Sequence, residues 1–90
     1  MIPISNFDWD EQNLEHIHNH HVEDYEAEDV LLFDDPLYYR RKENKYCVFG
    51  ITNGGRYLFI VFVVKGMGLI RVITARSMTK VEVSLYNKRR

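Results

Sequence analysis

The strongest constraint on the fold is an uninterrupted apolar segment, residues 57–64, that reads Tyr-Leu-Phe-Ile-Val-Phe-Val-Val. Successive side chains of a strand point to opposite faces of the sheet, so a strand that is apolar at every position needs cover on both faces. The segment is far shorter than the roughly 20 residues that cross a bilayer as a helix. It is therefore predicted to be the central strand of a sheet, with other elements packed on each face.

Turn signals on both sides of this segment predict an antiparallel meander. Asn53-Gly54-Gly55 tolerates positive φ and joins a strand over Lys45 to Thr52 to the central strand over Arg56 to Lys65. Gly66-Met67-Gly68 makes a second tight connection, into a strand over Leu69 to Ala75. A weaker strand is expected over Leu37 to Arg41.

Three helices are predicted around this meander. Asp10 is placed as the N-cap of a first helix over Asp10 to His20, which follows a short extended lead. A second helix is expected over Asp24 to Leu32, and Pro36 prevents its continuation. Thr79 and Glu82 have capping-box spacing, which predicts a C-terminal helix. The expected buried contacts are Tyr25, Ala27, Val30 and Leu31 on the second helix, and Val81, Val83, Leu85 and Tyr86 on the third.

The predicted class is α+β, with two N-terminal helices and a C-terminal helix on a small antiparallel sheet, in a single domain spanning residues 1–90.

Charge is divided along the chain. Residues 1–36 contain 11 acidic residues and no Lys or Arg, a net charge of −11, whereas residues 37–90 contain 12 basic and 2 acidic residues, a net charge of +10. A polyanion is repelled by the first part and attracted by the second. No signal peptide or membrane span is recognised, and the single Cys47 reads as a small apolar strand residue, so a soluble cytoplasmic protein is expected.

The four histidines fall on or beside the first helix. His16 and His20 are four residues apart and project from the same side, which suits acid/base chemistry near neutral pH. A surface histidine cluster on an acidic helix is the alternative, and it is favoured on pattern alone. A zinc site is the weakest interpretation, because a stable site needs a third or fourth ligand that the sequence does not mark. No metal or other cofactor is predicted.

Two groups of cations suit a polyanion. Arg56, Arg71 and Arg76 lie at or near strand ends, and the planar guanidinium matches phosphate. Strict alternation places Arg71 and Arg76 on opposite faces, so they share a site only if a bulge intervenes or Arg76 lies beyond the regular strand. Solvated or ion-paired arginines explain the same pattern equally well. The second group mixes cations with aromatics and suits RNA binding, although a charge-protected strand edge also accounts for it; its members are Arg40, Arg41, Lys42, Lys45 and Tyr46.

Several segments together resemble the BrnT family of toxins in their order and spacing. They are Phe7-Asp8-Trp9-Asp10, His16-Ile17, His20 before Val22, Phe33-Asp34-Asp35-Pro36, Gly55-Arg56-Tyr57-Leu58, Arg71-Val72-Ile73-Thr74-Ala75-Arg76, Met78-Thr79, Glu82 and Tyr86. The resemblance implies a RelE-like fold, a ribonuclease activity independent of the ribosome, and a cognate ribbon-helix-helix antitoxin of the BrnA type. DNA would be bound only through that antitoxin. Two positions depart from the pattern: His21 stands where a glycine is usual, and Ser77 where an acidic residue is common.

These observations lead to the hypothesis of a metal-independent endoribonuclease. A general base would deprotonate a ribose 2′-hydroxyl, and arginines would stabilise the charge on the phosphorane. His20 is the candidate acid/base with His16 as its companion, Arg56, Arg71 and Arg76 are the candidates for charge stabilisation, and Glu82 is expected to orient an arginine or act as base. The alternative is a catalytically inactive, toxin-like binding module that complexes a DNA-binding antitoxin. A zinc-binding structural domain ranks last.

Overall fold

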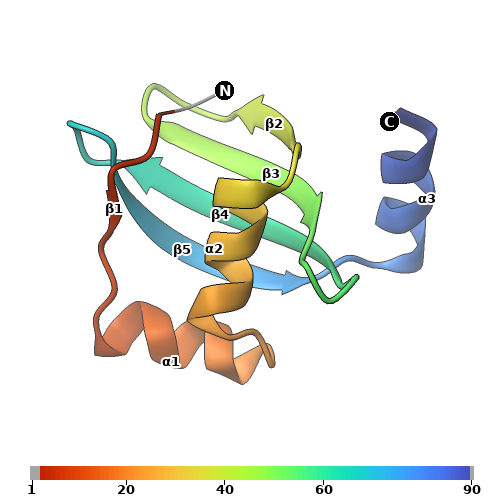
Figure 1. The fold of residues 1–90 in the computed structure, drawn as a ribbon, viewed down its shortest axis with the longest axis horizontal. Coiled ribbons are helices and arrows are strands. Elements are labelled where there is room, and N and C mark those ends of the chain that lie inside the picture. The colour runs from red at the N-terminus through yellow and green to blue at the C-terminus, as the bar shows by residue number, and fades with distance from the viewer. Residues whose placement is uncertain (1–2, 90) are drawn as a thin grey trace.

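The computed structural model describes residues 3–89 and shows an α+β fold of three helices and a five-stranded sheet (Figure 1). In chain order the elements are β1 (Asn6–Phe7), α1 (Glu11–Asn19), α2 (Asp24–Phe33), β2 (Leu37–Arg40), β3 (Lys45–Ile51), β4 (Tyr57–Val64), β5 (Leu69–Ser77) and α3 (Lys80–Arg89). The strand order is β1-β5-β4-β3-β2, so the apolar segment β4 is the central strand, as predicted.

The prediction of a purely antiparallel sheet is wrong. β2 to β5 form the expected antiparallel meander, but β1 pairs in parallel with the outer edge of β5. The short lead before α1 therefore serves as an edge strand. Its two residues carry no periodic pattern of their own, and the pairing depends on contacts with Leu69 and Ile70, more than sixty residues away in the chain.

Helices α1 and α2 cover one face of the sheet, and the main core lies between them and the strands (Figure 1). Ile17 of α1 and Val30 of α2 are fully buried against Leu58, Ile60 and Phe62 of β4. Gly50 of β3 permits a close approach of α2, since a Cβ at this position would lie 2.6 Å from the Val30 side chain.

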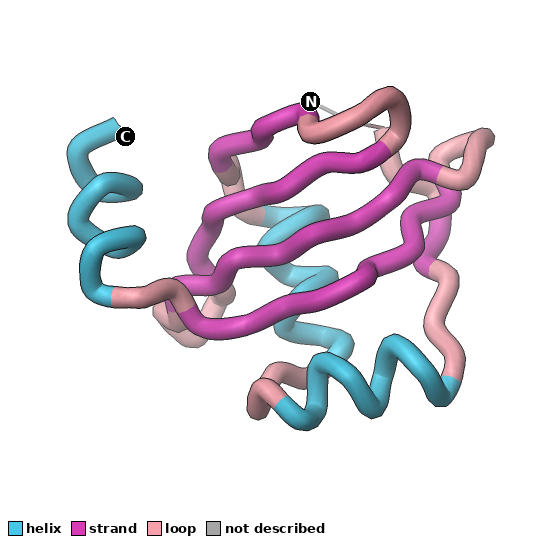
Figure 2. The backbone as a smooth tube through the Cα atoms, turned by 180° about the vertical axis from the view of Figure 1, so that it is seen from behind, coloured by secondary structure: helices cyan, strands magenta, loops and turns pink. Residues whose placement is uncertain are grey.

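The opposite face of the sheet is covered only at one end. Seen from behind, the strands lie in front of α2, α1 lies below the sheet, and α3 stands beside one end of it (Figure 2). We call this surface the open face. The prediction that other elements cover both faces of β4 is thus only partly met: on the open face Val61 is buried, but Phe59 and Val63 are half-buried.

Three predicted core contacts are wrong. Tyr25 of α2 is 62% exposed, and Val81 and Leu85 of α3 are 68% and 52% exposed. Tyr86 is the α3 side chain that is buried, edge-on to Tyr57 with ring centroids 5.9 Å apart. Because α3 touches the sheet only through one end of the open face, Val81 and Leu85 remain largely in solvent. None of the helices within residues 3–89 is long and apolar enough to cross a bilayer.

Candidate functional site

A β-bulge in β5 brings Arg71 and Arg76 to the same face of the sheet. The register between β4 and β5 shifts between Val61 and Phe62, so that Arg71 pairs with Val63 and Arg76 pairs with Phe59. Val63 and Phe59 are four residues apart on one strand, and both therefore point to the open face. The two arginines share that face, about 13 Å apart along the strand direction.

Arg76 and Glu82 form a bidentate ion pair at the end of the open face next to α3. Nη1 and Nη2 of Arg76 donate to Oε1 and Oε2 of Glu82 at 2.8 and 3.0 Å. The guanidinium carbon lies 4.4 Å from the centroid of the Phe59 ring. Hydrogen bonds from Arg76 and from the Thr79 N–H lower the pKa of Glu82, while the carboxylate raises the pKa of Arg76. Both groups are therefore ionised at neutral pH.

Glu82 reaches this position because the predicted capping box forms. The Thr79 N–H donates to Oε1 of Glu82 at 2.9 Å, and the Glu82 N–H donates to the Thr79 hydroxyl at 3.1 Å. These reciprocal bonds satisfy backbone donors at the start of α3 and fix the carboxylate toward β5. One side chain thus both caps the helix and pairs with Arg76.

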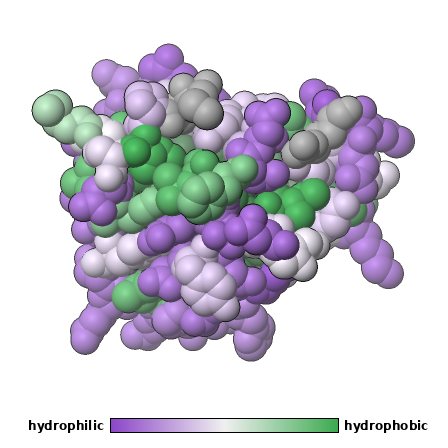
Figure 3. Space-filling model, viewed as in Figure 1, coloured by the Kyte–Doolittle hydropathy of each residue, from purple (hydrophilic) through white to green (hydrophobic). Residues whose placement is uncertain are grey.

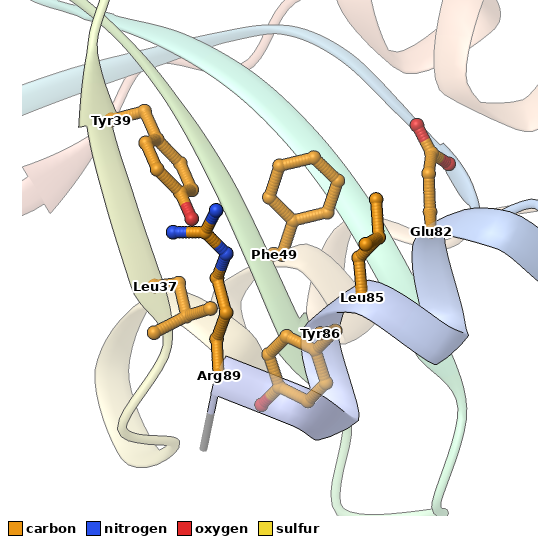
Figure 4. A pocket seen from close by; sticks show the side chains of 7 residues that line it. All are labelled: Leu37, Tyr39, Phe49, Glu82, Leu85, Tyr86 and Arg89. Atoms are coloured by element: carbon orange, nitrogen blue, oxygen red, sulfur yellow. The ribbon is translucent and has the colours of Figure 1, made fainter.

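A pocket of about 160 Å³ opens beside this pair, between α3 and the sheet (Figure 4). It is lined by Leu37, Tyr39, Phe49, Glu82, Leu85, Tyr86 and Arg89. The side chain of Arg89 extends from α3 toward Tyr39 (Figure 4). The pocket therefore combines an apolar, aromatic floor with one carboxylate and one guanidinium at its border.

Arg71 lies at the other end of β5, within a cluster of opposite charges. It contacts Oδ2 of Asp10 at 3.0 Å and Oδ2 of Asp8 at 3.4 Å, and Lys65 also donates to Asp8 at 2.8 Å. The pKa of Asp8 is lowered chiefly by the Lys65 hydrogen bond and that of Asp10 chiefly by the Arg71 hydrogen bond. Three carboxylate contacts neutralise much of the positive charge here.

The histidine pair of α1 lies along the edge of β5. Nε2 of His16 is 3.0 Å from the Thr74 hydroxyl, and the rings of His16 and His20 are 5.2 Å apart. His16 and Arg71 line the same shallow groove of about 210 Å³. Thr74 precedes Arg76 by two residues, about 7 Å along the strand. The structure thus brings His16 to the side of β5, with His20 one helical turn further away.

Arg56 connects the helical layer to the sheet. Its Nη1 donates to the His21 carbonyl oxygen at 2.7 Å and to Glu26 at 2.8 Å, and its Nη2 donates to the Ser77 hydroxyl at 3.2 Å. With three partners, its guanidinium is held on the connection between α1 and α2. It does not join Arg76 and Glu82, so the three predicted arginines occupy three separate environments.

The residues predicted to bind RNA divide between three locations. Arg40, Arg41 and Lys42 are exposed where β2 turns into β3, but the Arg40 guanidinium donates to the carbonyl oxygens of Lys42 and Glu43 and so closes its own turn. Lys45 pairs with Val63 and belongs to the open face. Tyr46 points to the other face and stacks on the core residue Phe62, with centroids 5.6 Å apart.

Sequence reasoning did not single out the pocket residues Leu37, Phe49 and Arg89. For Leu37 and Phe49 the signal is positional, because side chains on a strand alternate and these two lie directly opposite each other on adjacent strands. Arg89 joins them from α3. Finding them requires the register of the sheet. Among residues 3–89, no three His, Cys, Asp or Glu side chains come together in a way that could hold a metal ion.

Comparison with known proteins identifies a family. A family profile described as ribonuclease toxin, BrnT, of type II toxin-antitoxin system matches residues 9–82. A search of curated proteins finds no match. The matched residues run from Trp9, just before α1, to Glu82 in α3, and they contain every predicted site residue from His16 onward.

Proposed function

The chain belongs to the BrnT family, the ribonuclease toxins of type II toxin-antitoxin systems, and we propose that it cleaves RNA at Arg76 and Glu82 on the open face. The family implies an antitoxin partner and an RNA target. We further infer that the fold is RelE-like, since helices cover one face of the sheet and leave the other accessible, and that the antitoxin is a ribbon-helix-helix protein of the BrnA type. DNA would then be reached only through that antitoxin.

The bidentate Arg76–Glu82 pair carries this proposal. Cleavage by this route needs a base and a phosphate-binding guanidinium that can reach the same phosphodiester. Glu82 and Arg76 are such groups, and they are in direct contact on an accessible surface. Side-chain exposure of 35% for Arg76 and 23% for Glu82 leaves room for a ligand. A phosphate oxygen can replace one carboxylate oxygen on the guanidinium, because phosphate and carboxylate oxygens both accept hydrogen bonds from its N–H groups.

In the proposed reaction Glu82 accepts the proton of a ribose 2′-hydroxyl. The resulting alkoxide attacks the adjacent phosphorus, and Arg76 stabilises the negative charge of the phosphorane oxygens. The bond to the 5′ oxygen then breaks, which leaves a 2′,3′-cyclic phosphate and a 5′-hydroxyl. Glu82 in the free protein is a weak base because Arg76 lowers its pKa. A bound phosphate adds negative charge beside the carboxylate and raises that pKa, so substrate strengthens the base.

The leaving 5′ oxygen needs a proton, and His16 is the proposed donor. It lies at the edge of β5 beside Thr74, two residues from Arg76. RNA crossing this edge would bring its scissile phosphate between the two groups. His20 is proposed to support His16 through the contact between their rings. Arg71, beside His16, would bind a neighbouring phosphate once Asp8 and Asp10 release part of its guanidinium.

Cleavage of single-stranded RNA in the presence of EDTA tests the proposal. Purified wild-type protein should cut the RNA to fragments with 5′-hydroxyl and cyclic phosphate ends. Glu82→Gln should lower the rate about 10² to 10⁴-fold and Arg76→Ala about 10² to 10³-fold. Glu43→Gln is the matched control, because it removes the other acidic residue of the basic part. Unchanged cleavage by Glu82→Gln would refute the assignment, and loss of wild-type activity with EDTA would point to a metal.

A second candidate function is an inactive module that binds the antitoxin. It is supported by apolar side chains on the outer side of α2, where Leu32 is 43% exposed and Phe33 is 72% exposed. Figure 3 shows an apolar area over the C-terminal half of α2 within an otherwise mostly hydrophilic face. Contiguous apolar surface of this kind typically marks a protein contact. Harmless expression of the wild type without antitoxin, together with intact RNA, would favour this function over the nuclease.

A further inference from the structure

Aromatic side chains form a continuous row across three strands of the open face. Tyr39 of β2 is edge-on to Phe49 of β3 with centroids 5.9 Å apart, and Phe49 lies 5.0 Å from Phe59 of β4. Phe59 is covered in turn by the Arg76 guanidinium. We call these three side chains the aromatic row, and it leads directly to the proposed reaction centre.

The row is accessible where it borders the pocket. Tyr39 is 38% exposed on the edge strand, and Tyr39 and Phe49 both line the pocket next to α3. Aromatic rings of a core are normally covered, and Phe62, which faces the helices, is fully buried. An accessible ring surface between Arg76 and Arg89 is therefore available to a flat ligand that carries negative charge nearby.

We propose that the aromatic row stacks an unpaired base of single-stranded RNA and so places the neighbouring phosphate at Arg76. This inference rests on the proposed ribonuclease function and adds the recognition of unpaired RNA. Stacking on sheet-borne aromatic side chains is a general means of binding single strands, because every base has a π-face. Guanidinium groups at both ends of the row supply the charge that a phosphate requires.

The geometry favours a base over an apolar side chain of a protein partner. Ring surfaces from two strands line the pocket and Arg89 lies at its border, while the Arg76 guanidinium covers the adjacent Phe59 ring, so an apolar residue bound here would lie beside these charges. A duplex is disfavoured, since its bases are stacked on one another and present only their edges. The row therefore selects for loops and unpaired segments.

Binding of a fluorescein-labelled single-stranded DNA oligonucleotide, measured by anisotropy, tests the row without cleavage, because DNA lacks the 2′-hydroxyl nucleophile. Tyr39→Ala is expected to weaken binding about 5- to 150-fold, and Tyr39→Phe is expected to bind like the wild type. Tyr25→Ala, which removes an aromatic side chain 62% exposed on α2, is the matched control and should have no effect. An abasic oligonucleotide of the same length should bind wild type and Tyr39→Ala equally.

The outcomes separate this proposal from the nuclease assignment. Weaker binding by Tyr39→Ala, specific to the oligonucleotide with bases, supports the row even if no RNA is cut. If Tyr39→Ala loses the same affinity for both oligonucleotides, or loses none, the proposal is overturned even if the protein is a nuclease. A fall in mass by light scattering for Tyr39→Ala, with unchanged oligonucleotide affinity, would make the row an interface between two copies and would also overturn it. Should Tyr39→Ala unfold, Tyr39→Leu gives the same contrast, because it keeps an apolar contact with Phe49 but has no flat face.

Discussion

The coupling between Arg76 and Glu82 can be isolated by a double-mutant cycle with Arg76→Met and Glu82→Gln. Glutamine at position 82 keeps an oxygen that accepts from the Thr79 N–H, so the capping box survives while the charge is lost. Methionine at position 76 keeps an unbranched side chain over Phe59. The cycle therefore cancels the capping and packing contributions and leaves the free energy of the pair.

The expected coupling energy lies between two limits. Exposed ion pairs contribute about 0.2 to 1 kcal/mol, and hydrogen bonds to charged groups contribute about 1.5 to 3 kcal/mol. The two side chains are 35% and 23% exposed, and they share two bonds of 2.8 and 3.0 Å. Partial burial with bidentate geometry places the coupling at about 1 to 2 kcal/mol.

Urea denaturation of the four proteins at neutral and acid pH measures this coupling. The folded pKa of Glu82 is lowered from its ordinary value of 4.5. The stabilisation is therefore fully present above that value and is lost as the pH falls through the lowered pKa of the folded protein. A coupling energy below about 0.3 kcal/mol at neutral pH, which is within the usual error of additivity, would refute the argument. A coupling that persists after the carboxylate is protonated would refute it as well.

Three further predictions concern the scaffold. Gly50→Ala should destabilise the protein by about 1 to 3 kcal/mol in urea denaturation, because its Cβ would lie 2.6 Å from Val30, whereas Gly54→Ala, whose Cβ would meet only the Thr52 hydroxyl at 3.8 Å, should change stability little. His21 has a φ of 61°, in the left-handed region, so His21→Gly should raise the free energy of unfolding by up to about 1 kcal/mol, and a loss of stability would contradict the strain argument. Arg71→Met should raise the pKa of both Asp8 and Asp10 in an NMR titration. The larger change is expected at Asp10, since the main hydrogen bond on Asp8 comes from Lys65. Unchanged pKa values would show that Arg71 does not pair with these carboxylates in solution.

Features with local sequence signals were predictable. Asp10 caps α1 as expected, since its carboxylate accepts from the Asn13 N–H, and the Thr79–Glu82 box opens α3. The apolar segment of β4 identified the central strand, and Cys47 is buried in β3. In each case the determining contacts are only a few residues apart or follow from composition. The usual glycine at position 21 is also explained, because the backbone there has positive φ.

Features that depend on long-range contacts were not predictable. The bulge in β5 reverses the alternation of side chains between the two faces after Arg71, and no residue type in this strand predicts a bulge. Its partner is Asn13 of α1, a buried amide that donates to the carbonyl oxygens of Val72 and Asp8. Only the packed position of α1 against β5 makes this bond possible. The sequence therefore left open whether Arg71 and Arg76 share a face of the sheet. A common phosphate-binding surface for the two arginines required that they do.

The division of charge along the chain is reflected in the carboxylates with which the cations of the basic part pair. Acidic residues from the first 36 positions pair with Arg56, Lys65 and Arg71, so these three cations are partly neutralised from outside the basic part. Arg76 instead pairs with Glu82, one of only two acidic residues after position 36. A polyanion that displaces Glu82 from one edge of Arg76 meets no second carboxylate in contact with that guanidinium among residues 3–89, whereas at Arg71 it meets two. On the proposed function, this difference places the scissile phosphate at Arg76 and leaves Arg71 to a flanking one, so Arg76→Ala should reduce the rate of cleavage more than Arg71→Ala does.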